Sequence, residues 1–239
     1  MNTHIDARDR LIVALDVPSA AEAERLVDRM GDQVRFVKVG LELYTVAGPD
    51  IVRILVDRGK RVFLDLKFLD IEETVRRATA RVAAMGATFL TVHANRKALL
   101  AAVQGRGQSN LKLLAVTVLT NFDGEDLRDM GIQRSVRDLV TARAQLAAQV
   151  GCDGVVASGE EPAAIRATVG PGLIIVTPGV RPAGTGTDDH ARATTPTQTI
   201  AAGADYLVIG RPIRDADDPA LATAAILAEM QTAFDRRIG

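Results

Sequence analysis

The chain of 239 residues has no tryptophan, a single cysteine, and only six phenylalanines and two tyrosines. With Cys152 as the one thiol, an internal disulfide and a thiolate metal cluster are both excluded. So few aromatic rings argue against RNA binding by base stacking. The 29 basic and 30 acidic residues nearly cancel, which gives no electrostatic reason to expect a nucleic-acid or membrane partner. Any anionic ligand must therefore be held by local charge.

Long apolar runs are also missing. No segment approaches the roughly 20 residues of a membrane span, and the opening MNTHIDARDR is polar where a signal peptide needs an apolar core. We therefore expect a cytoplasmic protein without a membrane segment. The composition, 47% hydrophobic and 25% charged, is typical of a globular protein. Its length suits one barrel, so we expect residues 1–239 to form a single domain.

Short runs rich in Val, Ile and Leu recur along the chain, mostly separated by Ala-rich segments with helical spacing. Most of the runs are continuous rather than alternating, as in parallel strands that are covered on both faces. This pattern predicts an α/β fold, a closed (β/α)₈ TIM barrel. An open doubly wound sheet is the alternative, but Asp16-Val-Pro18 stands where that fold usually has a glycine-rich turn. The predicted strands are Leu11–Val17, Phe36–Gly40, Arg61–Lys67, Phe89–Ala94, Lys112–Thr120, Gly154–Gly159, Ile174–Val180 and Tyr206–Gly210.

Charged residues interrupt the first three strands near their C-terminal ends. Asp16 ends the first, Lys38 lies within the second, and Asp65 and Lys67 end the third. Asp70 follows at the start of the next helix. A lone buried charge costs several kcal/mol unless it is paired, and the four strand charges sum to zero. Any single pair could be an ordinary salt bridge. Four such charges on consecutive strands favour a site at the barrel mouth, where barrel enzymes place their chemistry.

The last two strands carry features of an anion site. Gly210 and Arg211 follow the eighth strand, and Gly179 ends the seventh at the matching level. Loops after these two strands often bind phosphate through backbone N–H groups and an arginine. The longest irregular segment, Arg181–Thr195, is of the length that lids and binding loops have. Turn glycines with a solvated arginine would be the simpler explanation of either feature alone.

At these positions the sequence resembles the bacterial orotidine 5′-phosphate decarboxylases, from Leu11 to about Pro219. The signature D-x-K-x-x-D-I-x-x-T is present as Asp65 through Thr74. The flanking matches are ALD at 14–16, VKVG at 37–40, TPGVRPAG at 177–184 and DYLVIGRPI at 205–213. D-x-K-x-x-D alone is not specific, because related barrel decarboxylases share it. In this order and together, the motifs are specific.

The resemblance implies decarboxylation of orotidine 5′-monophosphate (OMP) to UMP and CO₂ without a cofactor or metal. It gives Lys67 the role of proton donor to C6 of the pyrimidine. It places Asp65 and Asp70 beside the departing carboxylate. Asp16 and Lys38 are expected to bind ribose hydroxyls, and Lys38 is also expected to pair with Asp65.

Further contacts come from the same resemblance. Thr120, at the end of the fifth strand, is expected to contact the pyrimidine. Arg181, Gly210 and Arg211 are expected at the phosphate. The lid of the family usually carries a glutamine that reaches the phosphate, and His190 occupies that place here. An imidazole can also donate a hydrogen bond there.

The resemblance also implies a homodimer, in which Asp70, Ile71 and Thr74 reach the site of the partner. The sequence departs from the family beside them, where Leu69 and Glu72 replace a usual histidine and proline. The charged residues of the signature, Asp65, Lys67 and Asp70, are all present. This departure therefore affects the local backbone more than the chemistry.

Two other functions are open on the residues alone. A magnesium-dependent decarboxylase or aldolase of the same superfamily would act on a keto-sugar phosphate and also use Asp65, Lys67 and Asp70. Such enzymes bind their metal through a carboxylate after the second strand, where Lys38 would repel Mg²⁺. A barrel that binds a nucleotide as a regulator, without chemistry, is the other possibility, and the intact Lys67 with its carboxylates argues against it.

Overall fold

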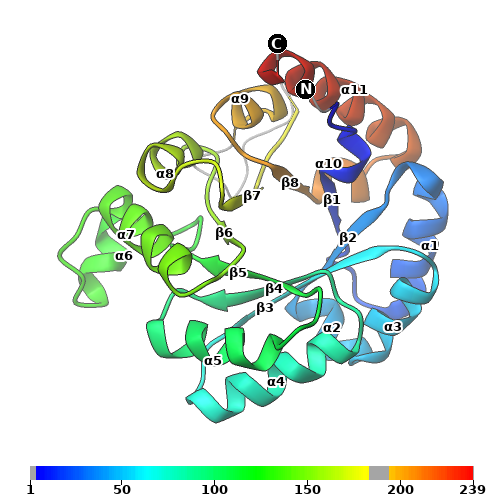
Figure 1. Cartoon of the computed structure of the whole chain (residues 1–239). Coiled ribbons are helices and arrows are strands. Elements are labelled where there is room, and N and C mark those ends of the chain that lie inside the picture. The colour runs from blue at the N-terminus through cyan, green and yellow to red at the C-terminus, as the bar shows by residue number, and fades with distance from the viewer. Residues whose placement is uncertain (1–3, 183–193, 239) are drawn as a thin grey trace.

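The computed structural model describes residues 4–182 and 194–238. Eight parallel strands close into a barrel in chain order, because β8 pairs with β1 as well as with β7 (Figure 1). This confirms the predicted (β/α)₈ barrel. The strands are β1 (Leu11–Ala14), β2 (Phe36–Val39), β3 (Arg61–Phe68), β4 (Phe89–His93), β5 (Lys112–Val116), β6 (Gly154–Val156), β7 (Ile174–Pro178) and β8 (Tyr206–Ile209).

The helices surround the barrel and cover its outer face (Figure 1). Ser19 caps the first of them by accepting a hydrogen bond from the Glu22 N–H. Gly31 ends that helix with φ 60°. The helices are α1 (Ala20–Met30), α2 (Leu41–Ala47), α3 (Asp50–Asp57), α4 (Glu72–Ala84), α5 (Arg96–Arg106), α6 (Gly124–Asp129), α7 (Val136–Gln149), α8 (Pro162–Val169), α9 (Pro196–Ala201), α10 (Arg211–Arg214) and α11 (Pro219–Ile238). None of those helices, as described, combines the length and the apolar character that crossing a membrane requires.

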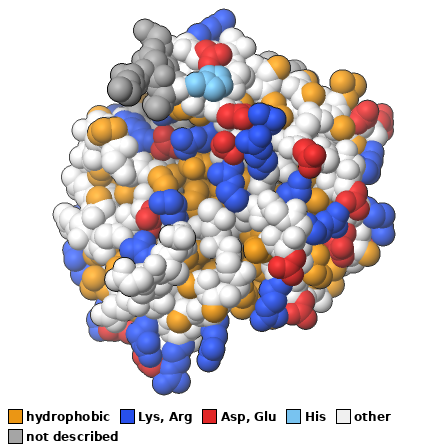
Figure 2. All heavy atoms as spheres, turned by 45° about the vertical axis from the view of Figure 1, so that its right-hand side comes forward, with side chains coloured by type: hydrophobic (Ala, Val, Ile, Leu, Met, Phe, Trp, Pro, Cys, Tyr) orange, Lys and Arg blue, Asp and Glu red, His pale blue; other side chains and the backbone are white. Residues whose placement is uncertain are grey.

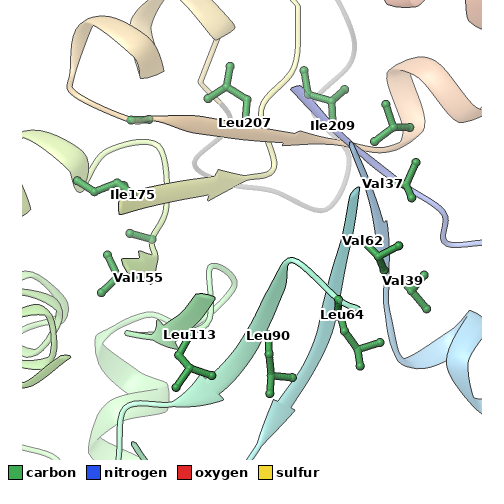
Figure 3. Packing of buried hydrophobic residues seen from close by; sticks show 14 of the residues in the cluster. Val37, Val39, Val62, Leu64, Leu90, Leu113, Val155, Ile175, Leu207 and Ile209 are labelled. Carbon is green, nitrogen blue, oxygen red and sulfur yellow. The ribbon is translucent and has the colours of Figure 1, made fainter. Parts of the chain in front are cut away.

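The apolar core has two layers, one on each side of the strands. Figure 3 shows strand residues such as Val62, Leu90 and Leu113 pointing away from the barrel axis. They pack in one cluster with helix residues such as Leu55 and Leu99. A smaller cluster fills the lumen. Strands buried on both faces explain why the apolar runs in the sequence are continuous.

Aromatic rings fill the lumen toward the N-terminal ends of the strands. The ring centroid of Phe89 lies 4.9 Å from that of Phe36, 5.9 Å from Phe63 and 5.2 Å from Tyr206. These four rings come from β2, β3, β4 and β8, and the three phenylalanines are almost fully buried. We call them the aromatic plug. It closes one end of the lumen, so a ligand can enter only from the other end.

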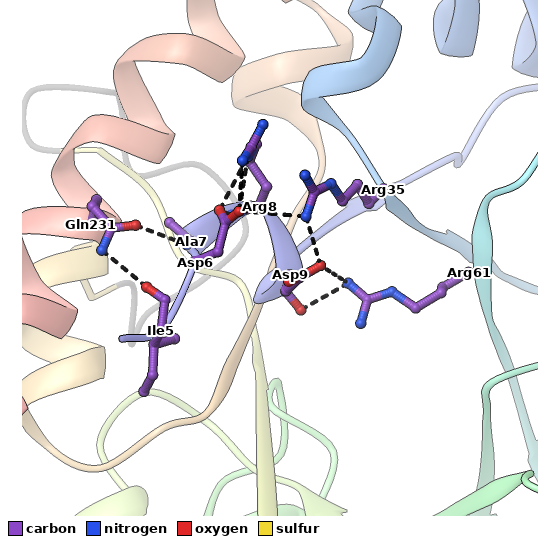
Figure 4. A network of polar contacts seen from close by, with 8 residues as sticks. All are labelled: Ile5, Asp6, Ala7, Arg8, Asp9, Arg35, Arg61 and Gln231. Carbon is purple, nitrogen blue, oxygen red and sulfur yellow. Dashed lines mark hydrogen bonds and ion pairs between the residues drawn. The ribbon is translucent and has the colours of Figure 1, made fainter. Parts of the chain in front are cut away.

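A group of ion pairs lies at the same end of the barrel, among residues that precede β1 and β2 or begin β3 (Figure 4). Asp6 pairs with Arg8 and Arg35, and Asp9 pairs with Arg35 and Arg61. The guanidinium of Arg61 also stacks over the Phe36 ring, 4.8 Å from its centroid. The hydrogen bond from Arg8 lowers the pKa of Asp6 to about 2. Every carboxylate and guanidinium of this group has a partner, which indicates a stabilising role.

Over the face drawn in Figure 2, acidic and basic side chains are interspersed. This agrees with a formal net charge of −1 for the whole sequence. The local charges that matter for a ligand therefore have to be sought inside the barrel mouth.

Candidate active site

A cavity of about 260 Å³ opens at the C-terminal ends of the strands. Its lining includes eight residues that the sequence selects for the site, contributed by β2, β3 and the segments that follow β1, β5, β7 and β8. The cavity therefore brings together residues that are far apart in the chain. The eight are Asp16, Lys38, Asp65, Lys67, Thr120, Arg181, Gly210 and Arg211.

Four of these residues form a continuous chain of alternating charge. The Nζ of Lys38 lies 2.8 Å from Oδ1 of Asp16 and 4.0 Å from Oδ2 of Asp65. The Nζ of Lys67 lies 3.0 Å from the same Oδ2 of Asp65. The Asp65 and Lys38 side chains are only 15% and 11% exposed, whereas Lys67 is 31% exposed. The inner pair, Lys38 and Asp65, is thus largely buried, and the two ends of the network, Asp16 at 38% and Lys67, are accessible.

The chain of β3 is irregular where it contributes its two charges. Leu64 is in register with Leu90, and Phe68 with Val92, so three residues of β3 face Thr91 alone. This is a β-bulge, a common device for aiming a side chain beside a site. Lys67 has φ 51°, and no other non-glycine residue among 4–182 and 194–238 has a positive φ. Such backbone strain persists only where the surroundings hold it.

The part of the cavity that follows β7 and β8 carries the glycines and arginines that predict an anion site. Gly179 follows β7 with φ 76°, a conformation that favours glycine. Gly210 lies directly between β8 and Arg211, the first residue of α10. Arg181 lies after β7, and its backbone N–H donates to the carbonyl oxygen of Thr194 at 3.1 Å. Two guanidinium groups and two glycines therefore line the same side of the cavity.

Apolar side chains complete the wall between the charged network and the two arginines. Within this apolar wall the effective dielectric constant is lower than in water, so the charges at its rim interact more strongly. The wall consists of Ala14, Phe63, Val116, Val118, Leu119, Val156, Pro178, Val180, Val208 and Pro212.

The predicted place of Thr120 at the end of the fifth strand is wrong. β5 ends at Val116, and Thr120 lies four positions later in the connection to α6. Val118 continues the apolar run beyond the strand because it lines the cavity. Hydropathy alone does not distinguish such a cavity wall from a strand.

Three predicted residues lie outside the cavity of this chain. Asp70, Ile71 and Thr74 are all exposed, and the Ile71 side chain is 73% exposed. The Asp70 carboxylate accepts a hydrogen bond from the Ile71 N–H at 2.6 Å, immediately before α4. These three residues therefore do not line this chain's own cavity. His190 lies outside the described residues.

His93 lies at the end of β4, beside the charged network. Burial, together with the nearby charges of Arg143 and Lys67, lowers its pKa. The imidazole is therefore neutral at pH 7. Cys152 is buried, and burial raises the pKa of its thiol to about 12. Among residues 4–182 and 194–238, no three His, Cys, Asp or Glu side chains are grouped as metal ligands.

Sequence reasoning missed Thr91, which is fully buried between Asp65 and the backbone of Lys67. The available signal was a hydroxyl residue inside the apolar run from Phe89 to Val92. A threonine in a strand is ordinary, because β-branched residues favour strands. Its hydrogen bonds to Asp65 and Lys67 form at the bulge in β3, which the sequence does not predict.

The fold and the cavity define a class: a (β/α)₈-barrel protein whose site joins a lysine–aspartate network to an arginine- and glycine-lined pocket at the strand C-termini.

Comparisons with known proteins narrow the class. The family model described as "Orotidine 5′-phosphate decarboxylase / HUMPS family" matches residues 9–226. A protein of Rhodopseudomonas palustris named orotidine 5′-phosphate decarboxylase is 52% identical over 229 residues, which cover 96% of this chain and 97% of the relative. One of the same name from Nitrobacter winogradskyi is 52% identical over 228 residues, 95% of each chain.

A solved structure agrees with these matches. The crystal structure of orotidine 5′-phosphate decarboxylase from Lactobacillus acidophilus superposes with a TM-score of 0.83 at 36% identity, covering 92% of this chain and 98% of that one. The chain belongs to the orotidine 5′-phosphate decarboxylase family.

Proposed function

We propose that this chain decarboxylates OMP to UMP and CO₂, a step of pyrimidine biosynthesis. Family membership over nearly the whole length supports this activity. The observation that carries it is the cavity that the Asp16–Lys38–Asp65–Lys67 network shares with Arg181 and Arg211. A nucleotide with a charged base at one end and a phosphate at the other has the matching distribution of charge.

Loss of CO₂ from C6 leaves a pair of electrons in an sp² orbital that the pyrimidine ring delocalises poorly. A catalyst must therefore stabilise the developing charge with groups that are already in place. The Lys67 ammonium, held 3.0 Å from Asp65, is such a group. In our proposal it faces C6, stabilises the negative charge as the C–C bond breaks, and then transfers its proton to C6. Lys67 becomes a neutral amine and regains a proton from solvent.

The carboxylates and Lys38 keep this ammonium in place. Asp65 lies between the two lysines, within 4.0 Å of both Nζ atoms. Its charge keeps the two ammonium groups close together despite their repulsion. Lys38 is further fixed by Asp16, and both are proposed to bind the ribose hydroxyls. Thr120, on the apolar wall, is proposed to contact the pyrimidine.

The phosphate is proposed to bind beside Arg211, Gly210 and Arg181. Arginine binds phosphate with two hydrogen bonds, and glycine allows the backbone N–H to approach. Binding at this side can contribute energy to the reaction at the other side by fixing the substrate and excluding water. His190 is proposed as a further phosphate donor from the segment that follows Arg181.

We further propose a homodimer in which Asp70, Ile71 and Thr74 contribute to the partner's cavity. Their exposure, on the connection from β3 to α4 and in the first turn of α4, supports this, as does the adjacent exposed side chain of Leu69. Large apolar side chains exposed next to one another are typical of an interface. In the dimer, Asp70 would stand near the carboxylate that departs.

A mixing experiment tests the shared site. Lys67→Ala and Asp70→Ala proteins are each expected to be nearly inactive. In a mixed dimer one site carries both substitutions and the other carries neither, so mixing restores about a quarter of wild-type activity after random exchange. No recovery after exchange that is proved by mass spectrometry would contradict the shared site.

The activity itself is tested by incubating the purified protein with OMP and following UMP by chromatography. EDTA is expected to leave the rate unchanged, because the Lys38 ammonium occupies the position beside Asp16 and Asp65. In D₂O the UMP is expected to carry deuterium at C6. A protein that forms no UMP, or that needs Mg²⁺ and acts on keto-sugar phosphates instead, would overturn the proposal.

A further inference from the structure

The bulge in β3 poses a local hydrogen-bonding problem. Three residues, Asp65 to Lys67, face Thr91 alone across the β3–β4 pairing. A regular ladder cannot satisfy all the backbone groups of such a segment. One of these three residues is Lys67, whose φ of 51° is a conformation that lysine rarely adopts. Something other than the regular ladder must hold it.

The Thr91 hydroxyl makes two hydrogen bonds that join the two charged residues. Its Oγ1 accepts from the backbone N–H of Lys67 at 2.9 Å. The same hydroxyl donates to Oδ1 of Asp65, also at 2.9 Å. A hydroxyl has a single proton, and an ionised carboxylate cannot donate, so the direction of both bonds is fixed. Oδ2, the other oxygen of Asp65, is left for the Lys67 ammonium at 3.0 Å.

These contacts close a small loop of interactions. Thr91 binds the backbone of Lys67, Asp65 binds the ammonium of the same residue, and Thr91 and Asp65 bind each other. Thr91 is fully buried, so water does not compete for these bonds. Its β-branched side chain restricts χ1 and keeps the hydroxyl on one side. The backbone and the ammonium of Lys67 are thereby both fixed relative to Thr91 on β4, the first directly and the second through Asp65.

We propose that Thr91 is a positioning residue for the decarboxylation, acting through Lys67 and Asp65 without touching the substrate. This rests on the proposed function and deepens it. The hydroxyl keeps the strained backbone at Lys67 in place and orients the Asp65 carboxylate toward the ammonium. Interactions that support a reacting group in this way are worth about ten- to a hundredfold in activity elsewhere.

The test compares Thr91→Val, which keeps the shape and removes the hydroxyl, with Thr91→Ser, which keeps the hydroxyl. Thr91→Ala is a second variant without the hydroxyl, should valine fail to fold. Thr223→Val is the matched control, since Thr223 is also fully buried but lies on α11. Each variant is assayed for kcat and KM with OMP, for UMP binding by calorimetry and for unfolding in urea.

The expected result is a kcat that is about ten- to a hundredfold lower in Thr91→Val, with KM and UMP affinity within about threefold of wild type. Thr91→Ser is expected to recover kcat to within about threefold, and Thr223→Val to keep it. Wild-type kcat in both Thr91→Val and Thr91→Ala would overturn the proposal. So would equal losses in the serine and valine variants, or in the control. Failure of the proposed function would look different, because the wild-type protein itself would not convert OMP.

Discussion

The two ends of the barrel carry similar residue types and use them differently. At the N-terminal end, Asp6 and Asp9 pair with three arginines over the aromatic plug. At the C-terminal end, Asp16 and Asp65 pair with lysines along the wall of a cavity. The first group lies at the closed end of the lumen, and the second leaves the Lys67 ammonium accessible. Ion pairs alone therefore do not mark a site. Their position on an open cavity does.

The backbone differs between the ends in the same way. Around the plug the strands pair in regular register, for example Phe36 with Arg61 and Phe63 with Phe89. Four residues after Leu64, the register of β3 has shifted, and Lys67 has a positive φ. Strain of this kind costs about 1–3 kcal/mol per residue and persists where the surrounding structure holds it. We infer that the plug and its ion pairs stabilise the fold, whereas the C-terminal end contains the strained backbone at Lys67.

The largest effect on stability is expected at the aromatic plug. Phe89→Ala removes the ring that contacts Phe36, Phe63 and Tyr206. The free energy of unfolding should fall by about 3–5 kcal/mol, measured by urea denaturation. For molecules that remain folded at low temperature, kcat should stay within about threefold. A Phe89→Ala protein that is stable but has lost its turnover would contradict the assignment of stability to the N-terminal end and activity to the C-terminal end.

Arg211→Ala is expected to lower activity while leaving stability almost unchanged, the reverse of Phe89→Ala. Loss of its proposed contact to phosphate should lower kcat/KM about a hundredfold, raising KM and also slowing kcat, because phosphate binding is expected to contribute to the chemical step. The unfolding free energy should change by less than about 1 kcal/mol. Steady-state kinetics with OMP measure the first effect and urea denaturation the second. A wild-type kcat/KM in this variant would show that Arg211 does not bind the phosphate.

Asp6→Asn tests the ion pairs of the N-terminal end. The folded pKa of Asp6, about 2, lies below its ordinary 3.8, so its charge stabilises the fold above pH 3.8, and this stabilisation is lost as the pH falls toward 2. The side chain is partly exposed, which limits the loss at neutral pH to about 1 kcal/mol. Urea denaturation should show the variant and wild type converging as the pH is lowered. A difference that grows at acid pH would contradict this.

The smallest effect is expected at His93. Its pKa in the fold lies below the ordinary 6.5, so the unfolded chain binds a proton more readily and stability falls as the pH drops below 6.5. His93→Gln should remove this part of the acid destabilisation. Urea denaturation of both proteins above and below pH 6.5 measures it. A variant that loses stability on acidification as steeply as wild type would show that His93 does not contribute.

Much of the fold can be predicted because the barrel imposes a simple pattern on the sequence. Strands that are covered on both faces need continuous apolar runs, and the charges that break those runs stand out. Lys38, Asp65 and Lys67 are identified in this way. The family motifs then indicate which of the residues take part in the chemistry.

The remainder depends on contacts between distant segments. The plug combines rings from β2, β3, β4 and β8, and no local sequence pattern predicts that these rings are in contact. The bulge that lets Thr91 bind Asp65 and Lys67 is a mismatch between two strands, which neither strand encodes alone. Regular alternation predicts the correct side for Asp65 and Lys67, but the actual geometry is irregular.

The most direct measurement compares Lys67→Ala with Lys112→Ala, a lysine of β5 at the other end of the barrel that pairs with Asp153 at 3.7 Å. Lys67→Ala should lower kcat with OMP by at least about a thousandfold, while UMP still binds and the unfolding free energy changes by less than about 1 kcal/mol. Lys112→Ala should keep wild-type kcat. Unchanged turnover in purified, folded Lys67→Ala would show that the ammonium at the barrel mouth is not the proton donor.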